Sequence, residues 1–274
     1  MTLQTALDLA GMGTDGTGVA GSWPVPRRVD VDSGTLRWTG SAGRATADGT
    51  ILGGFLALAD GSDDQIATLA RRYGPLLPPS DRLQTTGVQV LDSGSELVAA
   101  WRCIAGDVRR LLEVAAQLHR GQSTAPRAWA DFETFAARRS GGDVTVNLGR
   151  VGRAGRAAGI TDVWGQPPVP ATMSERQAVG WILSTWLRAT STAVTVVWTE
   201  GPPAVAVSAP GLLSAIVVQT AQMVSLSSEM AFCRGCGVPF ARRHGNRRYC
   251  DRCVDLKEPQ RRATAEFRRR QRDS

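Results

Sequence analysis

Four of the five cysteines in this 274-residue chain lie close together near its C-terminal end. Cys233 and Cys236 form one C-x-x-C pair, and Cys250 and Cys253 form a second pair after 13 intervening residues. Each pair can offer two thiolates from a tight turn, and two pairs supply the four ligands of a tetrahedral zinc site. The spacing predicts one structural Zn²⁺, with a redox dithiol and a four-cysteine iron–sulfur cluster as the alternatives.

The residues near the thiols favour a structural metal over a catalytic one. Gly237 directly follows the second thiol and permits the turn that points backbone amides at sulfur. Four protein thiolates fill the coordination shell and leave no open position for a substrate. His244 lies between the two pairs among arginines, and we interpret it as solvated or phosphate-facing, with a swap into the metal shell as the alternative.

Catalytic groups are scarce in the rest of the chain. It has 2 histidines, and neither a phosphate-binding P-loop motif nor a G-x-G-x-x-G motif occurs in it. We interpret Cys103 as an inert buried thiol, and Asp63 and Asp64 as charges in the first turn of a helix. We therefore expect that the chain is not an enzyme.

Positive charge is concentrated around the cysteines. The chain has a net charge of +7, and the segment 233–274 holds 13 Lys and Arg against 5 Asp and Glu. The first 232 residues hold 19 basic and 20 acidic residues, so the body is nearly neutral. A neutral body followed by a basic segment indicates two parts with separate roles.

Nearly all of this positive charge is arginine, whose planar guanidinium pairs with phosphate and with O6 and N7 of guanine. We predict duplex DNA as the partner; the alternatives are RNA or the ribosome, an acidic protein partner, and a solvated tail. The predicted nucleic-acid-binding residues are Arg242, Arg243, Arg247, Arg248, Arg261, Arg262, Arg268, Arg269 and Arg270.

A family resemblance rests on the same residues. The run Cys-x2-Cys-Gly-x2-Phe, then Arg-Arg-Tyr-Cys-x2-Cys and an arginine-rich helix, resembles the CGNR-type zinc finger. That finger occurs on bacterial proteins with an ABATE-like N-terminal domain, which are regarded as stress-response transcription regulators. The resemblance implies zinc on the four cysteines and DNA facing Arg247, Arg248 and the later arginines. The Gly-Asn-Arg of that family follows the fourth thiol, whereas Gly245-Asn246-Arg247 precedes the third one here.

We predict an α+β protein with two parts. Residues 1–229 would form an ABATE-like sensing or interaction body, mostly helical with short β-hairpins. Residues 230–274 would form a small treble-clef-like zinc finger with four cysteine ligands and a basic helix. The body would bind a small-molecule or protein effector or form a homodimer, and the whole chain would regulate transcription.

Local patterns predict several elements of the body. Apolar residues at steps of three and four predict a core helix from Glu96 to Arg120 that begins its buried face at Leu97. Ser62 with Gln65, and Ser174 with Gln177, form capping-box patterns that open two further helices. The predicted β-hairpins are RRVDVDSGTLRW and AVTVVWTEGPPAVAVSA. A short helix is predicted in PRAWADFETFAARRSGG, a strand in GDVTVNLGR, and a last body helix after Pro210-Gly211.

Two further expectations concern environment and packing. The chain has no run of 18 apolar residues and no secretory leader pattern, so we expect a cytoplasmic protein that neither enters a membrane nor forms disulfides. Its 8 tryptophans are consistent with core packing, and lining of a ligand pocket is the alternative.

Overall fold

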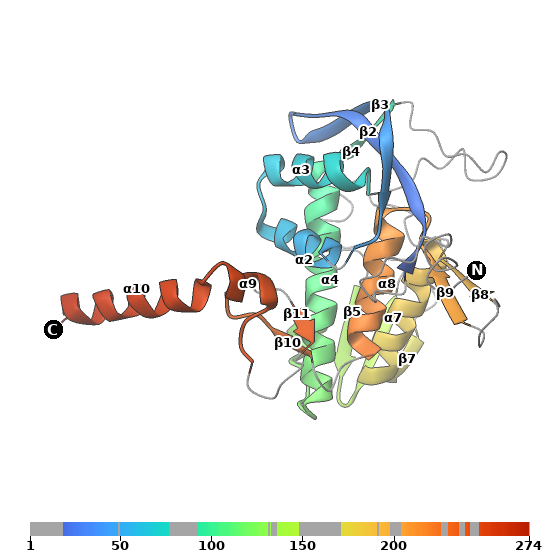
Figure 1. The fold of residues 1–274 in the computed structure, drawn as a ribbon. Helices are drawn as coiled ribbons and strands as arrows, with labels where there is room; N and C mark the ends of the chain where they lie inside the picture. The colour runs from blue at the N-terminus through green and yellow to red at the C-terminus, as the bar shows by residue number, and fades with distance from the viewer. Residues whose placement is uncertain are drawn as a thin grey trace.

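Helices form the centre of the molecule, and small sheets lie around them (Figure 1). The computed structural model describes residues 19–48, 50–76, 93–130, 132, 136–147, 171–190, 192–197, 204–225, 230–235, 239–241 and 247–273. Over these ranges the protein is α+β, as predicted. Among the described helices, none combines the length and the apolarity needed to cross a lipid bilayer.

A three-stranded antiparallel sheet lies at the top of the view in Figure 1. Its strands are β2 (Ser22–Asp32), β3 (Thr35–Thr46) and β4 (Ser93–Leu97). The predicted first hairpin is confirmed, because β2 and β3 pair on either side of Ser33-Gly34, which adopt φ of 48° and 76°. One face of the sheet buries four large apolar side chains against the helices, those of Trp23, Val29, Leu36 and Trp38.

Three short helical segments lie between β3 and β4 in the chain. They are α2 (Ile51–Leu56), the 3₁₀ segment η1 (Ala57–Asp60) and α3 (Asp63–Tyr73). The capping box that begins α3 is confirmed, since Ser62 Oγ accepts from Gln65 N and Gln65 Oε1 accepts from Ser62 N. Because both bonds satisfy free amides of the first turn, the start of α3 is determined locally.

The predicted long core helix is α4 (Val98–His119). Trp101, Ile104, Val108 and Leu111 are buried at 1% exposure or less, so the interpretation as a core helix is confirmed. The assignment of Leu97 to its buried face is wrong, because Leu97 ends strand β4 and is 39% exposed. Pairing with β3 keeps Glu96 and Leu97 extended, so the helix begins two residues later than predicted.

Two more helices complete the helical centre. The second predicted capping box, Ser174 with Gln177, is confirmed at the start of α7 (Glu175–Ala189). The predicted last body helix is α8 (Leu212–Ser225), which is buried at every residue from Leu212 to Thr220. It contacts α2, α4 and α7, so it is the central helix of the body.

The remaining body strands form two further sheets. In the first sheet, three short strands pair antiparallel in the order β5-β6-β7. In the second sheet, β9 pairs antiparallel with β8 and parallel with β1. The antiparallel pair of β8 and β9 confirms the hairpin predicted in AVTVVWTEGPPAVAVSA. The bounds are β1 (Val19–Ala20), β5 (Ala136–Ser140), β6 (Asp143–Asn147), β7 (Ala171–Ser174), β8 (Ala193–Val197) and β9 (Ala204–Ser208). The predicted strand in GDVTVNLGR is β6. The segment predicted as a short helix contains α5 (Pro126–Ala130) and then strand β5.

Most of the tryptophans serve the core. Five of them are at most 5% exposed: Trp23, Trp38, Trp101, Trp129 and Trp186. Trp181 is partly buried against the same core, and Trp164 and Trp198 lie outside the described residues. The core-packing interpretation is therefore confirmed for the five buried rings.

The C-terminal segment leaves the body at its lower left in Figure 1. It contains the antiparallel hairpin β10 (Met230–Phe232) and β11 (Pro239–Ala241), then α9 (Asp251–Asp255) and α10 (Glu258–Asp273). Strand β11 contacts the central helix α8, and α10 extends from α9 away from the body. We call residues 230–274 the C-terminal module.

Candidate metal centre

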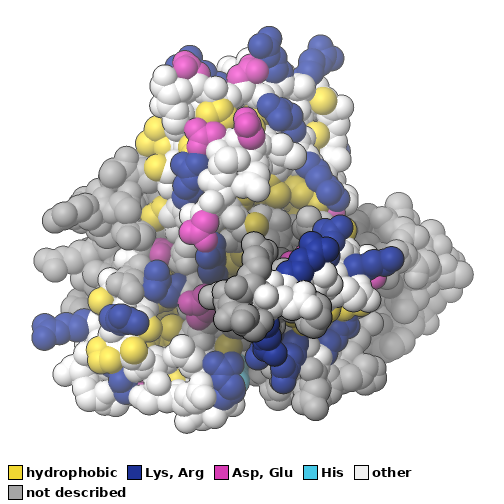
Figure 2. Space-filling view, turned by 90° about the vertical axis from the view of Figure 1, so that its left-hand side faces the viewer, with side chains coloured by type: hydrophobic (Ala, Val, Ile, Leu, Met, Phe, Trp, Pro, Cys, Tyr) yellow, Lys and Arg dark blue, Asp and Glu magenta, His cyan; other side chains and the backbone are white. Residues whose placement is uncertain are grey.

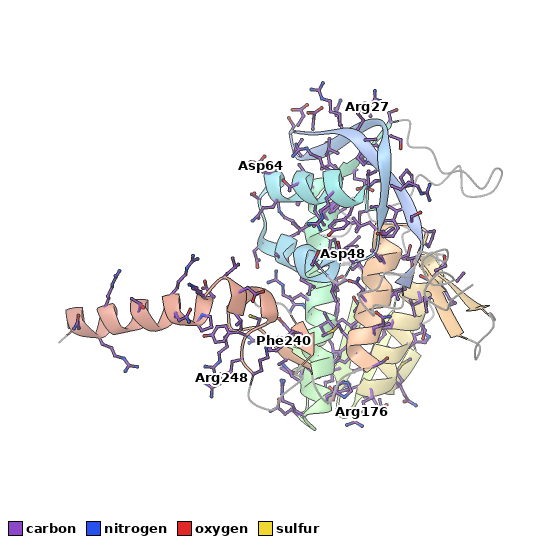
Figure 3. All side chains as sticks on the ribbon, viewed as in Figure 1. Arg27, Asp48, Asp64, Arg176, Phe240 and Arg248 are labelled. Carbon is purple, nitrogen blue, oxygen red and sulfur yellow. The ribbon has the colours of Figure 1, made fainter. Side chains whose placement is uncertain are left out.

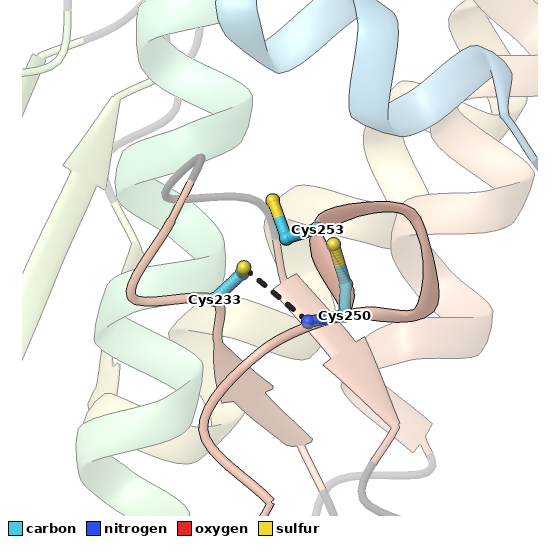
Figure 4. A group of neighbouring side chains, drawn as sticks. All are labelled: Cys233, Cys250 and Cys253. Carbon is cyan, nitrogen blue, oxygen red and sulfur yellow. Dashed lines mark hydrogen bonds between the residues drawn. The ribbon is translucent and has the colours of Figure 1, made fainter. Parts of the chain in front are cut away.

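Three cysteine sulfurs converge in the C-terminal module. Cys233 follows β10, Cys250 directly precedes α9, and Cys253 lies within α9. The Sγ atoms of these three residues all lie within 4.8 Å of one another (Figure 4). Cys233 and Cys253 are buried, at 3% and 5% exposure, and Cys250 is half-buried. The fold thus brings Cys233 next to Cys250, which lies 17 positions later in the chain, and next to Cys253.

Two backbone amides point at the sulfur of Cys233. Gly235 N and Cys250 N each donate to Cys233 Sγ over 3.3 Å. Amide donors of this kind stabilise negative charge on sulfur, as a thiolate bound to a metal requires. Because one donor comes from the turn after β10 and the other from the start of α9, both halves of the module support the same ligand.

Gly235 lies so close to Cys253 that a side chain at position 235 would clash with it. A Cβ built on Gly235 would lie 2.8 Å from Cys253 Sγ and 3.1 Å from Glu258 Cγ. Contacts below 3.0 Å are essentially never found for real Cβ atoms. A glycine at this position of the first C-x-x-C pair therefore lets the turn approach the second pair.

Backbone hydrogen bonds hold the two halves of the module together. Arg234 N donates to Arg248 O over 2.8 Å, next to the Cys250 to Cys233 bond. Val254 N donates to Cys250 O over 3.0 Å and begins the turn that carries Cys253 inward. The chain on either side of the sulfurs is thereby fixed by its own backbone.

The donor set fits a metal ion. Four thiolates at about 2.3 Å from a tetrahedral metal lie about 3.8 Å from one another, and the three sulfurs here are clustered on that scale. Thiolates select soft or borderline ions such as zinc, copper(I) and the iron of iron–sulfur clusters. The fourth predicted ligand, Cys236, lies outside the described residues. Cys233, Cys250 and Cys253 could thus hold a metal ion, as the sequence predicted.

No family model, curated protein or solved structure matches this chain. The site is therefore interpreted from its own geometry and from its surroundings.

The arginines between the thiol pairs differ in how firmly they are held. Arg247 is half-buried, donates from Nε to Tyr249 O over 2.9 Å and lies 5.8 Å from the centre of the Phe240 ring. Arg248 is exposed and points away from the body below α9 (Figure 3). Arg247 thus stabilises the module itself, while Arg248 is open to a partner. Arg242 and Arg243 lie outside the described residues.

The later predicted arginines all lie on α10. Arg261, Arg268 and Arg270 are exposed, and Arg262 and Arg269 occupy positions of the same helix. Residues 261 and 268 are seven positions apart, so they share one face of the helix. Figure 2 looks from the side on which α10 projects, and Lys and Arg side chains gather on and around it. Higher on the body, basic and acidic side chains are interspersed in that view.

The carboxylates near α3 serve the body. Asp63 and Asp64 lie in the first turn of α3, as interpreted from the sequence, and Asp63 pairs with Arg102 of α4. Asp60 pairs with Arg109 over 2.8 Å. These ion pairs join α3 and the preceding turn to α4.

Sequence reasoning missed a polar cluster at the start of α2. Asp48 Oδ1 accepts from Thr50 Oγ1 over 2.6 Å and from Thr50 N over 2.8 Å, and Oδ2 accepts from Tyr73 Oη over 2.7 Å. Burial raises the pKa of Asp48, but the bonds from Thr50 and Tyr73 and the charge of Arg72 outweigh it and hold that pKa below its ordinary value. Burial, together with the bond to Asp48, raises the pKa of Tyr73.

The same cluster reaches the central helix. Gln219 of α8 donates from Nε2 to Asp48 O over 2.7 Å, and its Oε1 accepts from Leu52 N over 3.1 Å. A groove of about 570 Å³ between α2 and α3 lies beside the cluster and is lined by Thr50, Gly54, Leu58, Leu69, Arg72 and Tyr73, among others. The run Asp-Gly-Thr at 48–50 could have revealed the cluster, because an Asp side chain readily accepts hydrogen bonds from the residue two positions later in a turn.

Proposed function

We propose that this chain is a zinc-dependent DNA-binding protein whose C-terminal module binds duplex DNA and whose body binds an effector. The observation that carries the proposal is the three-thiol cluster at the base of an arginine-rich helix that projects from the body (Figures 1 and 4). Zn²⁺ would be held by Cys233, Cys250 and Cys253 together with Cys236. Bound there, the ion would crosslink the hairpin to α9 and position the arginines.

The few apolar side chains that the described residues of the module bury support a structural role for the metal. Among its described residues, the buried apolar side chains are Ala231 and two of the cysteines themselves. The area that the described residues bury contributes little free energy of folding, whereas structural zinc contributes on the order of 10 kcal/mol to small domains. Four thiolates in two C-x-x-C pairs suit zinc better than a redox dithiol, which needs a single pair. A hairpin followed by a helix that together supply the thiols is consistent with a treble-clef-like finger.

Helix α10 has the dimensions and charge of an element that binds in or beside a DNA groove. Its 16 residues span about 24 Å, and the DNA major groove is wide enough to admit an α-helix. The helix carries six arginines and three acidic residues. Phosphate contacts from such arginines would supply affinity, and each one would release condensed counterions.

The body would regulate this binding. Its net charge is close to zero, so it would not compete with the module for phosphates. The groove between α2 and α3 is the candidate effector site, and the Asp48–Gln219 bond links its edge to α8, which contacts β11 of the module. A transcription regulator of the CGNR type is the function that this arrangement and the sequence resemblance support best.

The decisive experiment measures metal and DNA binding on the full chain. Elemental analysis should find one zinc per chain, and fluorescence anisotropy with a duplex at three salt concentrations should give a steep salt dependence. The double variant Arg261→Ala, Arg268→Ala should weaken binding and flatten the log–log slope by about 2. The matched control is Arg27→Ala, Arg28→Ala, because both residues are exposed on β2, and Arg27 lies at the end of the body far from the module (Figure 3).

Several outcomes would contradict the proposal. Iron in place of zinc would indicate a cluster protein. Structured RNA that outcompetes duplex DNA would favour an RNA-associated protein. Absence of salt-dependent binding to every nucleic acid would leave the module as a protein-binding adaptor with an acidic partner.

A further inference from the structure

Two large apolar side chains are exposed within the C-terminal module. Among the described residues, three large hydrophobic side chains are exposed: Leu97 at 39%, Val254 at 48% and Leu256 at 52%. Val254 and Leu256 lie two positions apart, at the end of α9 and in the turn before α10. Two of the three thus fall within one three-residue segment beside the thiol cluster, and apolar surface exposed beside a candidate binding site indicates a contact surface.

The backbone holds this segment firmly, so the exposure follows from the fold. Lys257 N donates to Val254 O over 2.9 Å, and Arg261 N donates to Lys257 O over 3.1 Å. Lys257 adopts a φ of 55°, which ends α9 and sets the direction of α10. The two apolar side chains are thus presented where α10 begins.

Exposed basic residues flank the apolar pair. Lys257 and Arg261 follow it on the chain, and Arg248 precedes α9; all three are exposed. Asp255 is the exposed acid between the two apolar residues. The segment therefore carries two exposed apolar side chains with exposed basic residues before and after them in the chain, a combination that fits base edges next to phosphates.

We propose that Val254 and Leu256 contact the 5-methyl groups of thymine in the DNA major groove, and so determine part of the sequence preference. This inference rests on the proposed DNA binding. A helix that enters the major groove presents residues near its N-terminal end to the bases, and the thymine methyl is the apolar group that base edges display there. The arginines of α10 would bind phosphates and supply affinity without sequence preference.

The test removes single methyl groups from the DNA. Wild-type protein first selects a duplex from a randomised pool, and that duplex is then synthesised with uracil in place of each thymine in turn. Loss of one contacted methyl should weaken wild-type binding about fourfold. In Leu256→Ala or Val254→Ala the same uracil substitution should have no effect, because the partner of the methyl group is gone.

Three controls accompany these variants. Arg268→Ala should weaken binding to every duplex and keep the uracil effect, and Leu97→Ala should change neither quantity. Asp255→Asn should strengthen binding to all sequences alike, since it removes an acid near the phosphates. Unchanged zinc content of each variant shows that the module is intact.

The outcomes separate this inference from the proposed function. If the wild-type chain binds no duplex, both are wrong. If it binds with salt dependence but no uracil substitution matters, or if Leu256→Ala and Val254→Ala both keep the uracil effect, only the thymine contact is wrong. Loss of self-association in Leu256→Ala without a uracil effect would make the apolar pair a dimer contact and would overturn the inference.

Discussion

The backbone amide of Cys250 donates a hydrogen bond to Sγ of Cys233 over 3.3 Å, although the two residues are 17 positions apart (Figure 4). The bond joins the first thiol pair to the start of α9. It places a donor on the sulfur that a bound metal would share, so the backbone of the second pair already supports Cys233 and a metal would add a second link. The parts of the candidate metal centre therefore depend on one another.

Cys250→Ser should abolish metal binding and unfold the C-terminal module while the body stays folded. Loss of one of the predicted thiolates would remove the main source of folding free energy for a module whose described residues bury few apolar side chains. Elemental analysis should find no zinc bound to the variant, and amide spectra should lose the dispersed signals of 230–274 alone.

Cys103→Ser is the matched control for that substitution. Cys103 is buried in α4, far along the chain from the cluster, so its replacement should leave the metal content unchanged. Equal metal content in both variants would contradict the assignment of the site.

Gly235→Ala should also impair the metal centre, through sterics. The new Cβ would lie 2.8 Å from Cys253 Sγ and 3.2 Å from Cys253 Cβ, so the side chain of Cys253 would have to shift. Competition with a chromophoric chelator should show weaker metal affinity. In contrast, Gly106→Ala in α4 has open space at its Cβ and should stabilise the body by about 0.5 to 1 kcal/mol. Metal affinity equal to that of wild type in Gly235→Ala would show that the turn is free to relax.

Glu175→Ala should destabilise the body by about 3 kcal/mol. Glu175 Oε1 lies 2.9 Å from Arg139 Nε, and the two side chains are only 12% and 16% exposed. Removal of the carboxylate would leave a nearly buried guanidinium without its charge partner and would also take an acceptor from Thr124. Urea unfolding followed by tryptophan fluorescence measures the loss.

Asp30→Ala removes an ion pair of a different kind and serves as the comparison. Asp30 and Arg28 lie 2.6 Å apart but are 57% and 74% exposed, so solvent screens the pair. The expected change is within about 0.5 kcal/mol. Similar losses for Asp30→Ala and Glu175→Ala would mean that burial does not set the strength of these pairs.

Asp48→Asn should reduce stability at neutral pH by about 1 kcal/mol, and the difference should shrink in acid. The pKa of Asp48 is held below its ordinary value, which is about 3.9, so the ionised carboxylate stabilises the fold above that pH. The contribution disappears as the pH falls through the lower pKa of the folded state. Urea unfolding at pH 7, 5 and 3 tests this, with Asp60→Asn at an 81% exposed carboxylate as the control. A constant difference across this range would contradict the prediction.

Residues close together in the sequence were enough to predict where helices begin and to recognise the thiol motif. The capping boxes at Ser62 and Ser174 were predictable because both partners lie within four residues. The apolar period of α4 and the turn at Ser33-Gly34 were predictable for the same reason. The two C-x-x-C pairs are also local, so the chemistry of the site could be expected before its geometry was known.

Only the tertiary structure decided which distant segments meet. Strand β4 has the sequence SGSEL, which carries no strand signal, and it is extended because β3 pairs with it while Gly94 leaves room for the Trp38 ring. The sequence did not show that Arg247 contacts Tyr249 O and the Phe240 ring, and its predicted role at DNA stays a prediction. These outcomes depend on contacts between residues far apart in the chain or on packing around a side chain. Residue type and spacing determine which local conformations and which chemistry a segment can adopt. Contacts with distant residues and the space around each side chain in the folded chain decide which of these it adopts.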